Sequence, residues 1–391
     1  MIPEILPTYN RAPLAFASGE GAWLTTTTGE RFLDFGAGIA VNALGHASPD
    51  LVGVLTEQAG RLWHVSNLYR IPEQERLAAL LVEHSFADTC FFTNSGTEAM
   101  ELAVKMARRH WHAAGQPERS TVIAFEGAFH GRSAAAIAAV GTPKMTEGFA
   151  PLLPGFRQLP WGDMEALEEA IRAPDTGAVI LEPVQGEGGI RPLPDADLRR
   201  IRALCDETGA LLILDEVQCG MGRTGRLFAH EWAGITPDIM LVAKGIGGGF
   251  PIGAVLATEH AAAAMTAGSH GSTYGGNPLG CAVAARVVEI MTDPAFLPEV
   301  NRKAGLLRQG LEGLAASHPG IFAGVRGSGL MLGLECRIAP ADVVAAGYGA
   351  GILTVPAADG VVRILPPLNI PDADIAEGLS RLDRAAATLA L

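Results

Sequence analysis

A lysine follows an apolar run at a place where its amine could react. The run is Ile239–Ala243, Lys244 comes next, and the glycine-rich stretch 245–249 follows at once. A short apolar run bounded by a turn signal is typical of a buried parallel strand, and open α/β sheets bind ligands at the carboxyl ends of such strands. Burial disfavours an ammonium ion and lowers its pKa, so Lys244 could form an imine. The alternative is a lysine that extends to the surface from a strand end.

Lysine is rare in this chain, which makes its presence here informative. The chain has 29 lysine and arginine residues, and only four of them are lysines: Lys105, Lys144, Lys244 and Lys303. Arginine could supply positive charge but cannot form an imine, so this chemistry would be a specific reason for a lysine at position 244.

Two other predicted strand ends carry groups that could bind a charged ligand. Asp215 follows the apolar run Leu211–Leu214, which predicts a carboxylate at the same edge of the sheet. Gly96 and Thr97 lie between a predicted strand that starts at Thr89 and a predicted helix. Free backbone N–H groups at the positive end of a helix dipole form an anion site, although an ordinary helix cap has the same composition.

An aromatic residue and an arginine follow the predicted strand at 121–125. Phe129 could stack on a planar ligand, and Arg132 could hold a carboxylate in a two-bond fork; either residue could instead be structural. Pyridoxal phosphate needs all these groups together: a lysine for its aldehyde, a carboxylate for its pyridine nitrogen and donors for its phosphate. The sequence therefore predicts pyridoxal phosphate as the cofactor.

The elements that must position these groups follow an α/β pattern. Apolar strands alternate with helices from about residue 89 to 245, which predicts βαβ units and a mostly parallel sheet. From about residue 295 the pattern changes to a smaller α+β domain, and 391 residues are enough for two domains. We expect an N-terminal segment (1–45) that packs with the small domain, a large cofactor-binding domain (46–278) and a C-terminal small domain (279–391).

Composition argues against several other classes of protein. The net charge of −13 and the lack of basic runs argue against nucleic acid as a partner. The five cysteines form no Cys-x-x-Cys pair, and the histidines at 110 and 112 fit an exposed helix end better than a metal site. We expect no metal, no membrane span and a cytoplasmic location with reduced thiols.

Seven motifs carry a resemblance that runs over nearly the whole chain. They are Asn94–Ala99, Phe129–Arg132, Glu182–Glu187, Asp215–Gln218, Gly222–Gly225, Lys244–Gly253 and Thr273–Pro278. On these motifs the chain resembles the class III, pyridoxal-phosphate-dependent aminotransferases of fold type I. That resemblance implies a large domain with a mostly parallel seven-stranded sheet and a smaller α+β domain.

The resemblance also implies a role for each matching position of the cofactor site. Lys244 would bind the cofactor aldehyde and shuttle a proton, and Asp215 would pair with the pyridine nitrogen. The remaining cofactor contacts would come from Gln218 at the ring hydroxyl, Phe129 on the ring face, and Gly96 and Thr97 at the phosphate. Cys219 is a small departure, since threonine is more usual there, and it affects no catalytic role.

The resemblance further implies a homodimer with shared active sites. Thr273, with Ser272 beside it, would act in the pocket of the other subunit, and Arg132 would hold a substrate carboxylate. Arg363 lies in an apolar run, where an unpaired charge is costly, so an acid partner is expected. Glu187 and Arg363 resemble a switch pair in which the glutamate masks the arginine for one substrate and frees it for the other.

The reaction implied is a ping-pong transamination through pyridoxamine phosphate. Ser66–Tyr69 and Val362–Leu368 favour family members that move the distal amino group of N2-acetyl-L-ornithine to 2-oxoglutarate in arginine biosynthesis. The products would be N-acetyl-L-glutamate 5-semialdehyde and L-glutamate. Ornithine, succinylornithine, succinyl-diaminopimelate and 4-aminobutyrate remain open as donors, as does an aminomutase. A nucleotide-binding role for the 245–249 loop is disfavoured because the Gly-x-x-x-x-Gly-Lys-Ser/Thr pattern is missing.

Overall fold

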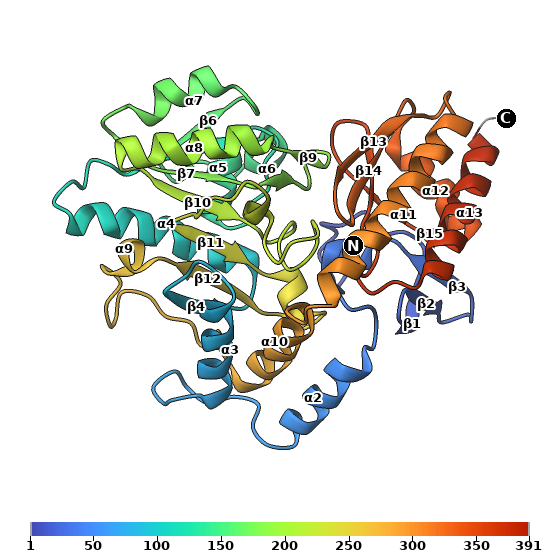
Figure 1. Ribbon diagram of the computed structural model, residues 1–391, viewed down its shortest axis with the longest axis horizontal. Coiled ribbons are helices and arrows are strands. Elements are labelled where there is room, and N and C mark those ends of the chain that lie inside the picture. The colour runs from blue at the N-terminus through green and yellow to red at the C-terminus, as the bar shows by residue number, and fades with distance from the viewer. Residues whose placement is uncertain (1, 390–391) are drawn as a thin grey trace.

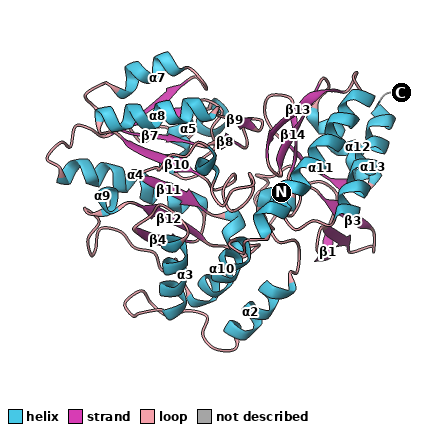
Figure 2. Cartoon of the chain, in the orientation of Figure 1, coloured by secondary structure: helices cyan, strands magenta, loops and turns pink. Residues whose placement is uncertain are grey.

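The computed structural model describes residues 2–389. One part holds a large sheet with helices on both faces, and the other holds smaller sheets covered by C-terminal helices (Figure 1, Figure 2). Within residues 2–389, no helix is both long and apolar enough to span a membrane.

The large sheet has seven strands and is mostly parallel, as predicted. Its order is β4 (Thr89–Thr93), β12 (Gly253–Ala257), β11 (Ile239–Val242), β10 (Leu211–Asp215), β7 (Thr176–Leu181), β5 (Thr121–Phe125) and β6 (Phe156–Leu159). Only β12 runs antiparallel to its two neighbours. The other adjacent pairs are parallel, so their carboxyl ends meet at one edge.

The central strands are apolar throughout because helices cover both faces of the sheet. In β10, Leu211 and Ile213 pack in the cluster that contains α4 (Gly96–Ala113). Leu212 and Leu214 pack on the opposite side with α7 (Met164–Ile171) and α8 (Asp195–Thr208). Because successive side chains of β10 pack against helices on opposite faces of the sheet, the run Leu211–Leu214 has no polar face.

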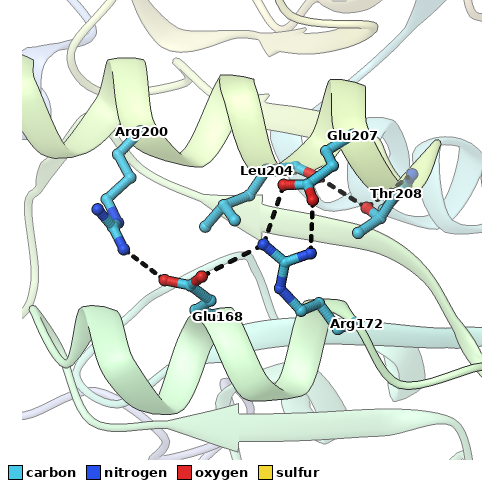
Figure 3. A network of polar contacts seen from close by, with 7 residues as sticks. Glu168, Arg172, Arg200, Leu204, Glu207 and Thr208 are labelled. Atoms are coloured by element: carbon cyan, nitrogen blue, oxygen red, sulfur yellow. Dashed lines mark hydrogen bonds and ion pairs between the residues drawn. The ribbon is translucent and has the colours of Figure 1, made fainter.

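A charged network joins α7 to α8 on the outer surface (Figure 3). Arg172 donates to both carboxylate oxygens of Glu207, at 2.8 and 2.9 Å, and to Glu168 at 3.2 Å. Arg200 of α8 also pairs with Glu168. These side chains are exposed, so the network adds little stability and should weaken as salt concentration rises.

The C-terminal part contains a four-stranded antiparallel sheet covered by three helices. The strand order is β13 (Phe322–Ser328), β14 (Met331–Cys336), β17 (Val361–Ile364) and β16 (Val355–Pro356). The helices are α11 (Phe296–Ser317), α12 (Pro340–Ala350) and α13 (Asp372–Leu389).

The N-terminal strands pair with this C-terminal part. A second four-stranded sheet has the order β1 (Phe16–Glu20), β2 (Trp23–Thr26), β3 (Arg31–Asp34) and β15 (Ile352–Leu353), with β3 parallel to β15. The domain boundaries near residues 46 and 279 stay a prediction.

The remaining elements of the described chain lie between those named above. They are α1 (Ala37–Ala40), α2 (Pro49–Ala59), α3 (Pro72–Glu83), α5 (Ala134–Val140), α6 (Pro143–Thr146), β8 (Val184–Gln185), β9 (Arg191–Pro192), η1 (Ala229–Trp232), η2 (Lys244–Gly247), α9 (Glu259–Ala262) and α10 (Pro278–Met291). Strand β10 ends at Asp215 because Asp215 Oδ1 accepts the N–H of Val217 at 3.0 Å and turns the chain.

Candidate active site

A cavity of about 330 Å³ lies where the parallel strands end at their carboxyl edge. Its volume is in the range of small-molecule sites, roughly 300–1,000 Å³. The lining residues that matter most are Asn94, Ser95, Gly96, Thr97, Phe129, His130, Gly131, Glu182, Asp215, Val217, Gln218 and Lys244. The fold therefore brings six predicted cofactor residues together: Gly96, Thr97, Phe129, Asp215, Gln218 and Lys244.

Lys244 projects into this cavity from a tight turn that follows β11. Its backbone is left-handed, with φ +47°, a conformation that costs energy for a residue with a side chain. Burial lowers the pKa of the Lys244 amine and outweighs the nearby Glu187 carboxylate, which raises it; the Arg363 charge also lowers it. The net shift increases the neutral, nucleophilic fraction of the amine.

Asp215 is held by two donors on the wall of the cavity. The side chain is only 4% exposed, and Oδ2 lies 2.7 Å from His130 Nδ1. Burial alone would lower the pKa of His130, but the hydrogen bond and charge of Asp215 outweigh burial, and the pKa is raised. The second donor is the N–H of Val217, at 3.0 Å from Oδ1, and the two contacts together fix the orientation of the Asp215 carboxyl.

Glu182 joins the loops that follow β5 and β7. Its two oxygens accept N–H groups from Phe129, at 3.0 Å, and from Gly186, at 3.2 Å. Burial raises the pKa of this carboxyl to about 7. The sequence patterns alone assign no role to His130 or Glu182, although each follows a predicted strand at the edge where the ligand should bind. That placement is the signal that could have identified them.

The beginning of α4 supplies backbone donors beside the cavity. Ser95 Oγ accepts the N–H of Glu98 at 3.2 Å. The N–H groups of Gly96 and Thr97, which come before Glu98 in α4, do not bond to this oxygen. A Cβ on Gly131 (φ +123°) would approach Thr97 Oγ1 to 2.4 Å, and a Cβ on Gly96 would approach Val217 to 2.9 Å. Glycine at these two positions lets three loops close around one space.

Arg363 reaches the same region from β17 of the C-terminal sheet. Its side chain is 2% exposed, and Nη1 donates to Glu187 Oε1 at 2.5 Å and to Gln218 Oε1 at 3.3 Å. Nη2 donates to the carbonyl of Pro356 at 3.2 Å. The acid partner expected for this buried arginine is therefore Glu187.

Five predicted site residues do not line the cavity of their own chain: the Glu187–Arg363 pair, and also Arg132, Ser272 and Thr273. Arg132 is exposed, with its guanidinium 5.3 Å from the centre of the Phe129 ring. Ser272 is half-buried and accepts the N–H of Gly275 at 2.9 Å, and Thr273 is exposed. Among the described residues, no cluster of three or more histidine, cysteine or acidic side chains is arranged to hold a metal ion.

The fold brings an amine, a carboxylate and helix N–H groups around one space, and these are the groups that a pyridoxal-phosphate-dependent transferase needs. The comparison with protein families agrees. The family model described as aminotransferase class-III matches residues 7–386, and the chain belongs to this family.

Individual relatives are similar over their whole length. An acetylornithine aminotransferase of Rhodobacter capsulatus is 68% identical over 389 residues, covering 100% of this chain and 99% of that protein. The crystal structure of N-acetylornithine aminotransferase from Stenotrophomonas maltophilia has 40% identity and a TM-score of 0.87, covering 98% of each chain. The ornithine aminotransferase structure from Toxoplasma gondii has 32% identity and a TM-score of 0.95, covering 99% and 93%.

Proposed function

We propose that the protein transfers the distal amino group of N2-acetyl-L-ornithine to 2-oxoglutarate, giving N-acetyl-L-glutamate 5-semialdehyde and L-glutamate in arginine biosynthesis. The observation that carries this proposal is the 68% identity to the Rhodobacter capsulatus acetylornithine aminotransferase. Similarity of fold does not separate the donors, because the ornithine aminotransferase of Toxoplasma gondii has a TM-score of 0.95.

The cavity fits pyridoxal phosphate in the chemistry of its walls. Lys244 would hold the cofactor aldehyde, Asp215 would face the pyridine nitrogen, and Phe129 would cover the ring. Gly96 and Thr97 would bind the phosphate, and Gln218 would reach the ring hydroxyl. When bound, the cofactor supplies an electron-withdrawing ring that makes the substrate C–H bond acidic.

The chain's own residues then control protons and charge. Lys244 Nζ, whose pKa is lowered by burial, would take a proton from the carbon that bears the amino group. His130 orients the Asp215 carboxyl through the 2.7 Å contact, so that this carboxyl would face the pyridine nitrogen of the bound cofactor.

Two charged side chains would recognise the substrates. Arg132 would bind a substrate carboxylate in a fork. Glu187 would neutralise Arg363 while the amino donor is bound and would move aside when 2-oxoglutarate brings its second carboxylate. Their 2.5 Å contact in the structure corresponds to the neutralised arrangement.

A second copy of the chain would complete the site. A set of large side chains between residues 62 and 69, together with Tyr274, is highly exposed: Trp63 (66%), Leu68 (86%), Tyr69 (67%) and Tyr274 (61%). Asn67 donates to the carbonyls of Ser272 and Gly275 at 3.1 and 3.0 Å, so this surface adjoins Thr273. We infer a homodimer in which Ser272 and Thr273 act in the partner's cavity.

The five cysteines are free within the described chain, which supports a cytoplasmic location.

A panel of amino donors with 2-oxoglutarate as acceptor tests the function. The enzyme loaded with cofactor should show its highest kcat/KM with N2-acetyl-L-ornithine, ahead of N2-succinyl-L-ornithine, succinyl-diaminopimelate, L-ornithine and 4-aminobutyrate. Lys244→Ala should lower the rate by at least about 10²–10⁴ and remove the visible absorbance of the lysine-bound cofactor. A preference for free ornithine, or a colourless protein that binds a nucleotide, would refute the proposal.

A further inference from the structure

The loop that carries Glu187 follows β7 of the large sheet along the chain but is fastened to the C-terminal sheet. It connects β8 to β9 as a short hairpin, in which Gln185 is paired with Arg191. The backbone carbonyl of Glu187 itself accepts the N–H of Ala358 at 3.0 Å. Ala358 lies in the turn between β16 and β17, and β17 carries Arg363. The two members of the Glu187–Arg363 pair therefore come from segments that touch through their backbones.

Charged side chains strengthen this contact on its outer side. Arg326 of β13 donates through Nε to the carbonyl of Gly189 at 2.7 Å and through Nη2 to Asp359 Oδ2 at 2.7 Å. Arg191 approaches the same Asp359 oxygen at 3.4 Å. Mainly the hydrogen bond from Arg326 lowers the pKa of Asp359, so the carboxylate is charged over the working pH range. We call Arg326, Asp359 and Arg191 the outer clamp.

The close packing beneath the outer clamp leaves little room for the 186–190 loop to take another position. Ile190 is fully buried with φ +54°, and a Cβ on Gly327 would come within 2.8 Å of its side chain. A Cβ on Gly189 would lie 2.6 Å from Arg326 Nη2 and 2.7 Å from the carbonyl of Ala358. The hairpin therefore lies against the C-terminal sheet at close range, as Figure 1 shows for β9 and β13.

We propose that Arg326 and Asp359 are positioning residues for substrate selection: they hold the 186–190 loop so that Glu187 can neutralise Arg363. This inference rests on the proposed function, because it concerns the same Glu187–Arg363 pair. Neither residue lines the cavity, and each would act only through Glu187. When the outer clamp is weakened, Glu187 pairs less often with Arg363, and the exposed guanidinium favours a dicarboxylate over the amino donor.

Asp359→Asn is the informative substitution. Asp359 has φ +58°, and asparagine adopts this left-handed conformation readily, so the variant removes the charge without new backbone strain. Glu335→Gln is the matched control, because Glu335 pairs with Arg326 Nη1 at 3.3 Å but does not touch the loop. Arg326→Gln should behave as Asp359→Asn does.

The readouts are glutarate binding to the holoenzyme, the ratio of kcat/KM for the two half-reactions, and hydrogen exchange of the 187–190 amides. Asp359→Asn should tighten glutarate binding about two- to fivefold, the effect expected for a partly exposed charge pair. The ratio of kcat/KM for the amino-donor half-reaction to kcat/KM for the 2-oxoglutarate half-reaction should fall by a similar factor. The amides of residues 187–190 should exchange faster. Glu335→Gln should change none of the three.

The double variant with Glu187→Ala decides whether Asp359 acts through Glu187. In the Glu187→Ala background, Asp359→Asn should have no further effect on glutarate binding. An equal loss in both half-reactions, an unchanged glutarate affinity, or an effect that persists without Glu187 would overturn the inference. The panel of amino donors tests the proposed function separately, because an enzyme that prefers ornithine would refute that function. Glutarate binding tests only whether the outer clamp positions Glu187.

Discussion

At the scale of single residues, three ionisable side chains share a space that water hardly reaches. Asp215, His130 and Glu182 are between 2% and 4% exposed. His130 links to Asp215, and Glu182 accepts two backbone N–H groups close by. Burial favours the neutral form of Glu182 and raises its pKa above the ordinary value. The folded and unfolded chains therefore differ in the pKa of this carboxyl.

This difference predicts a pH dependence of stability in the cofactor-free protein. The folded pKa of Glu182 is about 7 against an ordinary 4.5, so between these values the folded chain binds more protons than the unfolded chain. The contribution of Glu182 to stability should therefore fall as pH rises through this window. Relative to Glu182→Gln, the wild-type free energy of unfolding should drop by roughly 2–3 kcal/mol.

Denaturant titrations from pH 4.5 to 7.5 measure this difference. Glu57→Gln removes an exposed carboxylate and serves as the control. Parallel curves for the wild type and Glu182→Gln would show that the buried carboxyl keeps an ordinary pKa.

At the scale of elements, the strand ends carry the predictable part of the site. The apolar runs before Lys244 and Asp215 predict both strands and the edge at which their side chains meet, because a fully buried parallel strand has no polar face. The antiparallel β12 could not be read from the pattern, since its direction depends on pairing with β11 and β4. The left-handed backbone at Lys244 is also a property of the folded turn and not of the residue type.

The contact between α4 and the loop after β5 gives an element-scale prediction. Gly131→Ala should lower the free energy of unfolding by about 1–3 kcal/mol, because its Cβ would meet Thr97 and its φ of +123° is strained for alanine. Cofactor affinity should also fall, since we propose that Thr97 binds the cofactor phosphate.

Gly115→Ala is the control for backbone strain alone. Gly115 has φ +75°, but nothing lies within 4 Å of the position of a Cβ there. This variant should lose some stability and keep its cofactor affinity. If both variants bind the cofactor as the wild type does, close approach at Gly131 is not what shapes the phosphate site.

At the scale of the whole molecule, the sequence predicts only some of the contacts between segments that lie far apart along the chain. A buried arginine in a strand demands an acid, which made Arg363 a candidate, but the pattern alone could not say which acid lies within reach. Glu187, 176 positions away, is identified by geometry and by resemblance to a family. Arg326 and Asp359 carried no signal because surface charges on strands and turns are common.

The exposed surface formed by Trp63, Leu68, Tyr69 and Tyr274 gives a prediction about dimer formation. Leu68→Asp should shift the protein from twice the 40.7 kDa chain mass towards the single chain and lower activity, because Thr273 would no longer reach a partner. Leu306→Asp, which changes a 40%-exposed leucine of α11, is the control. Light scattering at several concentrations measures the mass. A wild-type mass of one chain, with full activity, would contradict the shared site.

The parallel pairing of β3 with β15 has a consequence during protein synthesis. The partner strand of β3 emerges from the ribosome more than 300 residues after β3 itself. At a translation rate of about 5–20 residues per second, the N-terminal strands wait roughly 15–60 s with one edge unpaired. In that interval the large sheet can complete all of its strands, so the nascent chain carries an exposed β edge that a chaperone could cover until the last helices are made.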